Sequence, residues 1–350
     1  MKKYVILTVL IVIFLALAGC AHETENIKRK AAISPTETFI ENELLTSKGL
    51  IRTDLKKQKD TYLSESTGLW MLHLVAVKDE KRFQQQVMTV KQNFLQQNIV
   101  IWRIEDKKLA DVNALIDDFR IIYALYQASK LFNNKQYEEL ADRMSEQLIS
   151  RQRVDGIFVD YMDSHTFEKA QELTISYIDT ATLQWLKRHS KLSADVYQKQ
   201  LTILKGALQP EGYYAKRYDI ITQTYVVENE LHLIDQLYTA YHSALAGIDT
   251  TSFTQWLEQV YQRDEKLYGQ YTTTQQPLVN YESPAVYALS VLYFKEINEE
   301  EQAKIMYQQL LKLRSPIENK GYVDDNNNTH SFDNLLPLLV EGIYADEEVK

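Results

Sequence analysis

Six acidic side chains stand at comparable places in the sequence, each shortly after a short extended stretch and near the start of an expected helix. They are Glu65, Asp118, Asp179, Glu228, Glu282 and Asp333. Two opposed carboxyl groups can hydrolyse a glycosidic bond, because one protonates the leaving oxygen while the other activates a water. An acid in the first turn of a helix also stabilises that helix through its dipole. Position alone therefore does not separate a catalytic role from a structural one.

These acids follow an internal repeat. A bulky apolar residue marks each extended stretch, and the six markers are Ile51, Trp102, Phe158, Tyr213, Tyr268 and Tyr322. Successive markers lie 51, 56, 55, 55 and 54 residues apart, which leaves room for two helices in each interval. A near-constant period over six copies predicts a repeat architecture.

The segments between the markers have a helical pattern. Residues 109–132 and 283–313 carry apolar side chains at steps of three and four, which is typical of amphipathic helices. Six helical hairpins could form an open solenoid or a closed (α/α)6 barrel. We predict an all-α fold, an (α/α)6 barrel built from six helical hairpins, because tetratricopeptide-like solenoids have shorter periods of about 34 residues. One end of the barrel would then be ringed with carboxylates and aromatic rings.

The first 20 residues predict export. Two lysines precede an apolar run at residues 4–16, and Leu17-Ala18-Gly19-Cys20 resembles a bacterial lipobox. That resemblance implies a lipoprotein signal peptide over 1–20, with Cys20 lipidated; the alternative is an uncleaved membrane anchor. Residues 21–36 are polar and predict a flexible tether, so the single domain would span 37–350. We expect the protein on the extracellular face of the bacterial cell membrane, held there by its lipid anchor.

Composition limits the partners of this domain. The chain has 350 residues, a net charge of −9 and 45% hydrophobic residues. The acidic charge argues against binding nucleic acid or anionic polymers. Cys20 is the only cysteine, so the exported domain has no disulfides. The 23 Tyr, 11 Phe and 4 Trp suit both core packing and the apolar faces of sugars.

Two motifs carry a resemblance to a known family. Residues 64–72 (SESTGLWML) resemble the Ser-Glu-Gly-x-Gly-Tyr-Gly-Met motif of glycoside hydrolase family 8, with Ser66 and Trp70 in place of two glycines and Leu69 in place of the tyrosine. Residues 118–132 (DFRIIYALYQASKLF) resemble the signature of the same family, although its earlier aspartate is Ile116 here. The Trp-Lys-Ile that precedes this signature in the family is matched by residues 102–104 (WRI).

The motif that holds the general base in this family is not retained. In the family that base is an aspartate in a Tyr-x-Tyr-Asp-Ala-x-Arg stretch, and residues 225–230 (YVVENE) occupy the corresponding place. Neither the Asp-Ala pair nor the arginine is present. Glu228 is our candidate for a longer base, with Glu230 as the alternative.

The resemblance implies an (α/α)6 barrel and an inverting mechanism. Glu65 would be the general acid, with a pKa raised by partial burial near Trp70. Asp118 would stay ionised and bind the distorted sugar, while Glu228 would activate the water. The further substrate-binding candidates are Trp70, Trp102, Tyr177, Asp179, Tyr281 and Glu282. Each has a structural alternative, since Glu282 precedes Pro284 at an expected helix start and the aromatic rings could belong to the core.

We therefore expect an endo-acting, glucanase-like hydrolase that cleaves β-1,4-type linkages in cell-surface exopolysaccharide. The rivals are a polysaccharide-binding lipoprotein that has lost the chemistry and a polysaccharide lyase on the same barrel. No P-loop, Gly-x-Ser-x-Gly or Gly-x-Gly-x-x-Gly motif is present, and the seven His form no His-Glu-x-x-His motif. We expect no metal and no cofactor, and a monomer whose partners are the polysaccharide substrate and the membrane.

Overall fold

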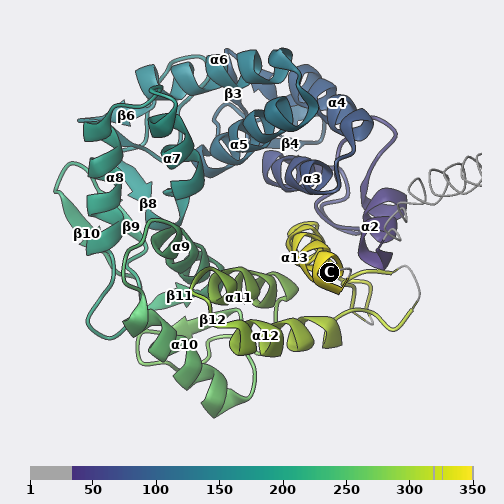
Figure 1. Cartoon of the computed structure of the whole chain (residues 1–350), viewed down its shortest axis with the longest axis vertical. Helices are drawn as coiled ribbons and strands as arrows, with labels where there is room; N and C mark the ends of the chain where they lie inside the picture. Colours follow the sequence, from purple (N-terminus) through teal and green to yellow (C-terminus); the bar gives the residue numbers. More distant parts are fainter. Residues whose placement is uncertain (1–33, 318–319, 325, 349–350) are drawn as a thin grey trace, which may run out of the picture. The chain divides into compact units, whose positions relative to one another are not determined.

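Six helices form the inner layer of the barrel in the computed structural model, which describes residues 34–317, 320–324 and 326–348. They are α3 (Ser64–Ala76), α5 (Leu115–Phe132), α7 (Thr180–Arg188), α9 (Leu233–Leu245), α11 (Pro284–Glu296) and α13 (Phe332–Glu348). Each contacts the next, and α13 contacts α3 (Figure 1). The ring therefore closes. This closure confirms the predicted (α/α)6 barrel and excludes the open solenoid.

The outer layer pairs one helix with each inner helix. Its members are α2 (Pro35–Phe39), α4 (Glu80–Thr89), α6 (Lys135–Arg151), α8 (Ala194–Gly206), α10 (Thr251–Asp264) and α12 (Glu300–Lys312). Wide helical turns extend α2 over Ile40–Leu44 and α4 over Val90–Phe94. Five pairs are hairpins in sequence, whereas the sixth joins α13 to α2 from opposite ends of the chain. A hydrogen bond of 2.9 Å from Thr36 to Glu341 links these two helices.

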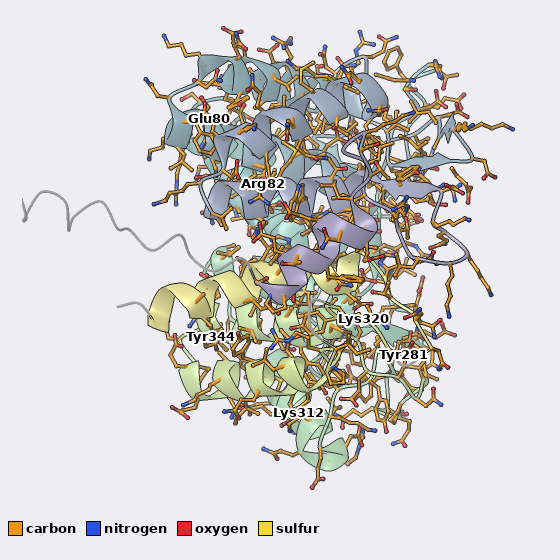
Figure 2. All side chains as sticks on the ribbon, turned by 90° about the vertical axis from the view of Figure 1, so that its right-hand side faces the viewer. Glu80, Arg82, Tyr281, Lys312, Lys320 and Tyr344 are labelled. Atoms are coloured by element: carbon orange, nitrogen blue, oxygen red, sulfur yellow. The ribbon has the colours of Figure 1, made fainter. Side chains whose placement is uncertain are left out.

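Short antiparallel strands lie in the connections that precede the inner helices. They are β1 (Thr61–Leu63), β2 (Leu95–Gln96), β3 (Ile99–Val100), β4 (Arg103–Glu105), β5 (Lys108–Leu109), β6 (Arg153–Val154), β7 (Ile157–Phe158), β8 (Glu172–Thr174), β9 (Arg217–Asp219), β10 (Thr224–Val226), β11 (Glu230–His232) and β12 (Gln270–Thr272). They pair as β1-β4-β5, β10-β9-β8, β11-β12, β2-β3 and β6-β7. Figure 2 shows strands gathered toward the side where Tyr281 is labelled, away from Glu80.

The starts of the inner helices face this strand-bearing end. Extended residues precede α3, α5 and α9, and none of these three helices has a side-chain cap on its first turn. Their first backbone N–H groups therefore leave the positive ends of three helix dipoles at one end of the barrel. Acidic side chains in these first turns, Glu65 among them, are favoured there.

The core fills the space between the two helical layers. Its largest fully buried side chains include Trp70, Trp256, Tyr287 and Phe119. The marker residues Ile51, Phe158, Tyr213 and Tyr322 are also buried. The repeat seen in the sequence therefore reflects one buried apolar side chain in most of the connections.

The predicted signal peptide and most of the predicted tether lie outside the described residues, as does the lipidation site Cys20. Helix α2 begins at Pro35, inside the range predicted as tether, and its Thr36 and Glu37 are buried. Across the described ranges, the length and hydropathy of every helix fall short of what a membrane span needs.

Candidate active site

Glu65 lies in the first turn of α3 and is held against the start of α5. The preceding Ser64 donates its backbone N–H to the carbonyl of Trp102 at 3.0 Å. Its hydroxyl donates to Asp117 Oδ2 at 2.6 Å. These two bonds fix the turn that carries Glu65 beside Asp117.

The surroundings of Glu65 favour its protonated form. Burial and the Asp117 carboxylate raise the pKa of Glu65 to about 8, the Arg120 guanidinium opposes that rise, and Asp333 adds to it. The residue keeps partial contact with solvent while protein surrounds its carboxyl group. A carboxylic acid that is neutral at pH 7 and open to solvent can donate a proton to a bound molecule.

Asp117 is the carboxyl group that lies beside this acid. It accepts hydrogen bonds from Arg120 Nη1 at 3.0 Å and from the Ser64 hydroxyl, and both Asp117 and Arg120 are almost fully buried. Burial raises the pKa of Asp117, while Arg120 and Ser64 act against that rise. No side-chain hydrogen bond reaches the Glu65 carboxyl from the described residues, whereas Asp117 has a guanidinium and a hydroxyl that stabilise a negative charge.

Asp118, the sequence-based candidate for sugar binding, is not in the site. It is fully buried and accepts hydrogen bonds from the Val100 N–H at 2.8 Å and from Asn113 Nδ2 at 2.7 Å. Consecutive residues of an α-helix point about 100° apart, so Asp117 and Asp118 cannot share one direction. The family signature identified the correct turn, but Asp117 is the side chain that lies beside Glu65.

We expect Asp118→Ala to destabilise the fold without removing a site group. The change leaves the Val100 N–H and the Asn113 amide without their acceptor inside the core, which costs about 2–4 kcal/mol for the pair. Chemical denaturation should measure this loss, with Asp60→Ala on an exposed turn as the control. A midpoint equal to that of the wild type would contradict the structural role.

A further carboxyl group, that of Asp235, lies on α9. Asp235 accepts a hydrogen bond from Ser176 Oγ at 3.0 Å and forms an ion pair with Lys216. Glu228, the predicted base, instead lies between β10 and β11, where its half-exposed side chain pairs with Arg217. The alternative candidate, Glu230, is exposed in β11. Asp235, and not Glu228, is therefore the acidic side chain in the first turn of the fourth inner helix.

Tyr177 shows that these acids converge. It lies in a short 3-10 turn, Ile175–Tyr177. Burial raises its pKa, and the charges of Asp117, Asp160, Asp235 and Glu65 raise it further. All four carboxyl groups therefore lie near enough to this one phenol to act on its pKa. Tyr177 is the one predicted substrate-binding residue that the structure brings among the acids.

The other predicted binding residues divide into two groups. Trp70 is buried and stacks on His73 at 5.1 Å between ring centroids, so its ring belongs to the core. Asp179 caps α7 by accepting the Thr182 N–H at 3.0 Å. Glu282 accepts the hydroxyl of Tyr287 at 2.5 Å. These three residues have structural roles.

Trp102 and Tyr281 remain able to meet a ligand. Trp102 is half-buried next to the Glu65 turn, and the Arg103 guanidinium covers its ring at 4.6 Å from the centroid. Tyr281 is 52% exposed on the rim (Figure 2). Within the described ranges, His, Cys, Asp and Glu side chains form no group of three or more that could hold a metal ion.

Gly68 allows α3 to approach Arg120. A Cβ at this position would lie 3.1 Å from Arg120 Cδ and 3.2 Å from Ile121 Cγ1. We therefore expect Gly68→Ala to displace Arg120 from Asp117 and to lower any activity at this site about tenfold, with a stability loss of about 1–3 kcal/mol. Kinetics and denaturation of this variant, compared with Gly342→Ala at an exposed position with no atom near the added Cβ, would measure both effects. Equal activity in both variants would show that the close approach is not needed.

Comparisons with known proteins find relatives over nearly the whole chain. No model of a known protein family matches the sequence. The Bacillus subtilis (strain 168) protein named "Putative lipoprotein YdaJ" is 34% identical over 361 residues, which cover 98% of this chain and 99% of YdaJ. The chain belongs to the YdaJ family.

Solved structures identify the fold of the YdaJ family. A protein described as a novel alpha-amylase from Clostridium perfringens has a TM-score of 0.82 and 26% identity, covering 88% of this chain and 96% of that one. PssZ from Listeria monocytogenes has a TM-score of 0.76 and 27% identity, covering 89% and 95%. Endoglucanase Cel10, a family 8 glycosyl hydrolase from Klebsiella pneumoniae, has a TM-score of 0.64 and 15% identity, covering 90% and 99%. The fold expected from the resemblance to glycoside hydrolase family 8 is confirmed, and the chain has a glycoside hydrolase-like fold.

Sequence reasoning missed Asp117, Arg120, Asp235 and Lys216. Asp117 and Arg120 stand three residues apart, a spacing at which opposite charges meet on a helix. Asp235 stands in the first turn of its helix, as Glu65 does. Both signals are present in the sequence, although neither separates a site residue from an ordinary surface pair.

Proposed function

We propose that this protein hydrolyses glycosidic bonds of an extracellular polysaccharide by inversion, with Glu65 as the general acid. The observation that carries the proposal is the pairing of a protonated Glu65 with the ion pair of Asp117 and Arg120 at the open end of the barrel. Glu65 would protonate the leaving oxygen. Asp117 would stay ionised and bind the sugar at the cleavage point, with Arg120 holding its orientation.

Asp235 is the general base in this proposal. Its carboxyl group lies on the fourth inner helix, and Ser176 and Lys216 fix its direction from two other segments. Tyr177, which lies among Glu65, Asp117 and Asp235, would bind a sugar hydroxyl between the acid and the base. This assignment replaces Glu228, whose ion pair with Arg217 keeps it on the rim.

The proposed substrate is a β-1,4-type cell-surface exopolysaccharide, as expected from the resemblance to family 8. An α-linked glucan is the second candidate, because the structure with a TM-score of 0.82 is described as a novel alpha-amylase. A binding protein without catalysis is the third. The serine at position 66 does not by itself favour loss of activity, since Ser66 Oγ bonds Ser331 Oγ at 2.8 Å and joins α3 to α13.

The proposed location is the extracellular face of the membrane, with lipid attached to Cys20. The lipobox-like residues 17–20 and the name of the relative YdaJ support this location. Labelling with a fatty acid should mark the wild type and leave a Cys20→Ser variant unmarked. Labelling of both proteins would overturn the assignment of Cys20.

The activity test uses residues 21–350 and follows new reducing ends. The polymers are β-1,4-glucan, partly deacetylated chitin, starch and a bacterial exopolysaccharide. Because a general acid contributes about 10²–10⁴-fold to the rate, we expect Glu65→Gln to lose that factor on whichever polymer is cleaved. Glu139→Gln on the exposed face of α6 should keep full activity.

The outcomes separate the candidates. Cleavage of starch alone would replace the β-linked substrate by an α-linked one, and binding of a polymer with no cleavage would favour the binding protein. Unchanged cleavage by Glu65→Gln would overturn the assignment of the acid. The anomeric form of the first product, read by proton NMR, tests inversion directly.

A further inference from the structure

A second hollow lies at the opposite end of the barrel. It has a volume of about 660 Å³ and is lined by residues 123–130 of α5, by α7, by the last residue of α9 and by the first turn of α6. Asp117 is in the first turn of α5 and Lys130 in its last, so about 20 Å of helix separates the two places. The hollow is therefore distinct from the site around Glu65.

Three stacked rings form one wall of this hollow. Trp185 stacks between Tyr126 and His189, with centroid separations of 3.4 Å and 3.8 Å and planes within 17° of parallel. The Tyr126 hydroxyl donates to Asp142 at 2.8 Å. His189 Nδ1 lies 2.8 Å from the Trp185 carbonyl, which can only accept. The wall is thus fixed at both ends, and the exposed His189 ring presents its Nε2 as an acceptor.

Polar side chains with free hydrogen-bonding capacity line the rest of the hollow. Tyr123, Gln127, Ser129 and Asn133 all line it, and their side chains make no hydrogen bond to any residue that the structure describes. Amide and hydroxyl groups beside aromatic rings are suited to sugars, whose hydroxyls donate and accept while their ring faces are apolar.

The charge of this lining differs from that of the chain. Lys130, Lys135 and Arg188 line the hollow together with one acid, Glu138, although the whole chain has a net charge of −9. None of the three cations forms an ion pair within the described ranges. Lys130 and Arg188 are in last turns, where a cation stabilises the helix end, but Lys135 is the first residue of α6, where the dipole disfavours it. Helix stability does not account for its position.

We propose that this hollow is a second binding site, for an acidic saccharide. The acidic group lies toward Lys135 and Arg188, the hydroxyls meet Gln127 and Tyr123, and the sugar ring rests against the aromatic wall. Such a site holds a polymer to the protein at a place where no bond is cleaved. It does not depend on the proposed hydrolysis, because binding here uses none of the residues around Glu65.

The test measures binding by calorimetry to residues 21–350 carrying Glu65→Gln, so that no turnover interferes. The probes are trigalacturonate, glucose 6-phosphate, neutral maltotriose and inorganic phosphate. A small polar ligand of this kind should bind with Kd of roughly 0.1–1 mM. A Lys135→Ala, Arg188→Ala double variant should weaken binding of the acidic sugars at least about tenfold, the equivalent of one charge-assisted contact.

The matched control is Lys187→Ala, which removes a cation from the same helix. Lys187 lies 4.5 Å from the Tyr197 ring centroid and does not line the hollow, so binding should stay within about twofold of the parent. Asp235→Asn should also leave binding unchanged. The proposal is overturned if neither acidic sugar binds, if maltotriose binds equally well, if phosphate alone matches them, or if the double variant binds normally.

Discussion

An Asp235→Asn variant is expected to lose about 10²–10⁴-fold in kcat on the polymer that the wild type cleaves, because an amide cannot accept the proton of the attacking water. KM should change little, since Ser176 and Lys216 remain in place to hold the side chain. The measurement is steady-state release of reducing ends at pH 6 to 7. Added azide should restore part of the rate if a missing base is the cause, as a small anion can attack in place of water.

Glu228→Gln is the matched comparison, because it removes the carboxylate that the sequence analysis placed in the same role. Its ion pair with Arg217 is about one-third exposed, and exposed pairs of this kind contribute less than about 1 kcal/mol. We expect kcat within about twofold of the wild type. A large loss of kcat in Glu228→Gln together with a small loss in Asp235→Asn would identify Glu228 as the base. The assignment of the base to Asp235 on α9 would then be overturned.

The fold could be predicted from the sequence because its period is long and regular. Buried side chains such as Phe158 and Tyr213 recur at one point of most units, and helical pairs fill the intervals. The helix pair that closes the barrel could not be predicted in the same way. It joins α2 to α13, and contacts between the two ends of a chain leave no local period.

The site could be predicted to the level of the helical turn but not of the side chain. Glu65 was predicted from its motif, and Tyr177 was one of the aromatic residues predicted to bind substrate. Asp118 was chosen where Asp117 lies in the site, because a match to a signature does not show which way a helix is rotated. Asp235 was missed because its partners, Ser176 and Lys216, are 59 and 19 residues distant.

The protonation of Glu65 leads to the second large expected effect, which is on the pH dependence of the rate. With a pKa raised to about 8, Glu65 is protonated at neutral pH and loses its proton in mildly alkaline solution. The rate should therefore fall about tenfold per pH unit above that value, since only the acid form can protonate a leaving group. If the rate instead begins to fall near pH 5, Glu65 is ionised at neutral pH and cannot be the acid.

Stability gives a readout of the same proton that does not need a substrate. The pKa of Glu65 is higher in the folded chain, about 8, than its ordinary value of 4.5. The folded state is therefore favoured fully below about pH 4.5, and this advantage is lost as the pH rises toward 8. Glu65→Gln has no proton to lose, so its stability relative to the wild type should increase between pH 5 and pH 8 by at most about 5 kcal/mol.

Thermal unfolding of both proteins across this pH range measures the difference, with Glu139→Gln as the control expected to follow the wild type. A constant difference between Glu65→Gln and the wild type would show that Glu65 titrates alike in the folded and unfolded chains. The site would then lack a protonated acid at neutral pH. A difference that grows and then levels off above about pH 8 would instead mean that the fold gives up stability to hold this carboxyl group beside Asp117, which is what a proton donor requires.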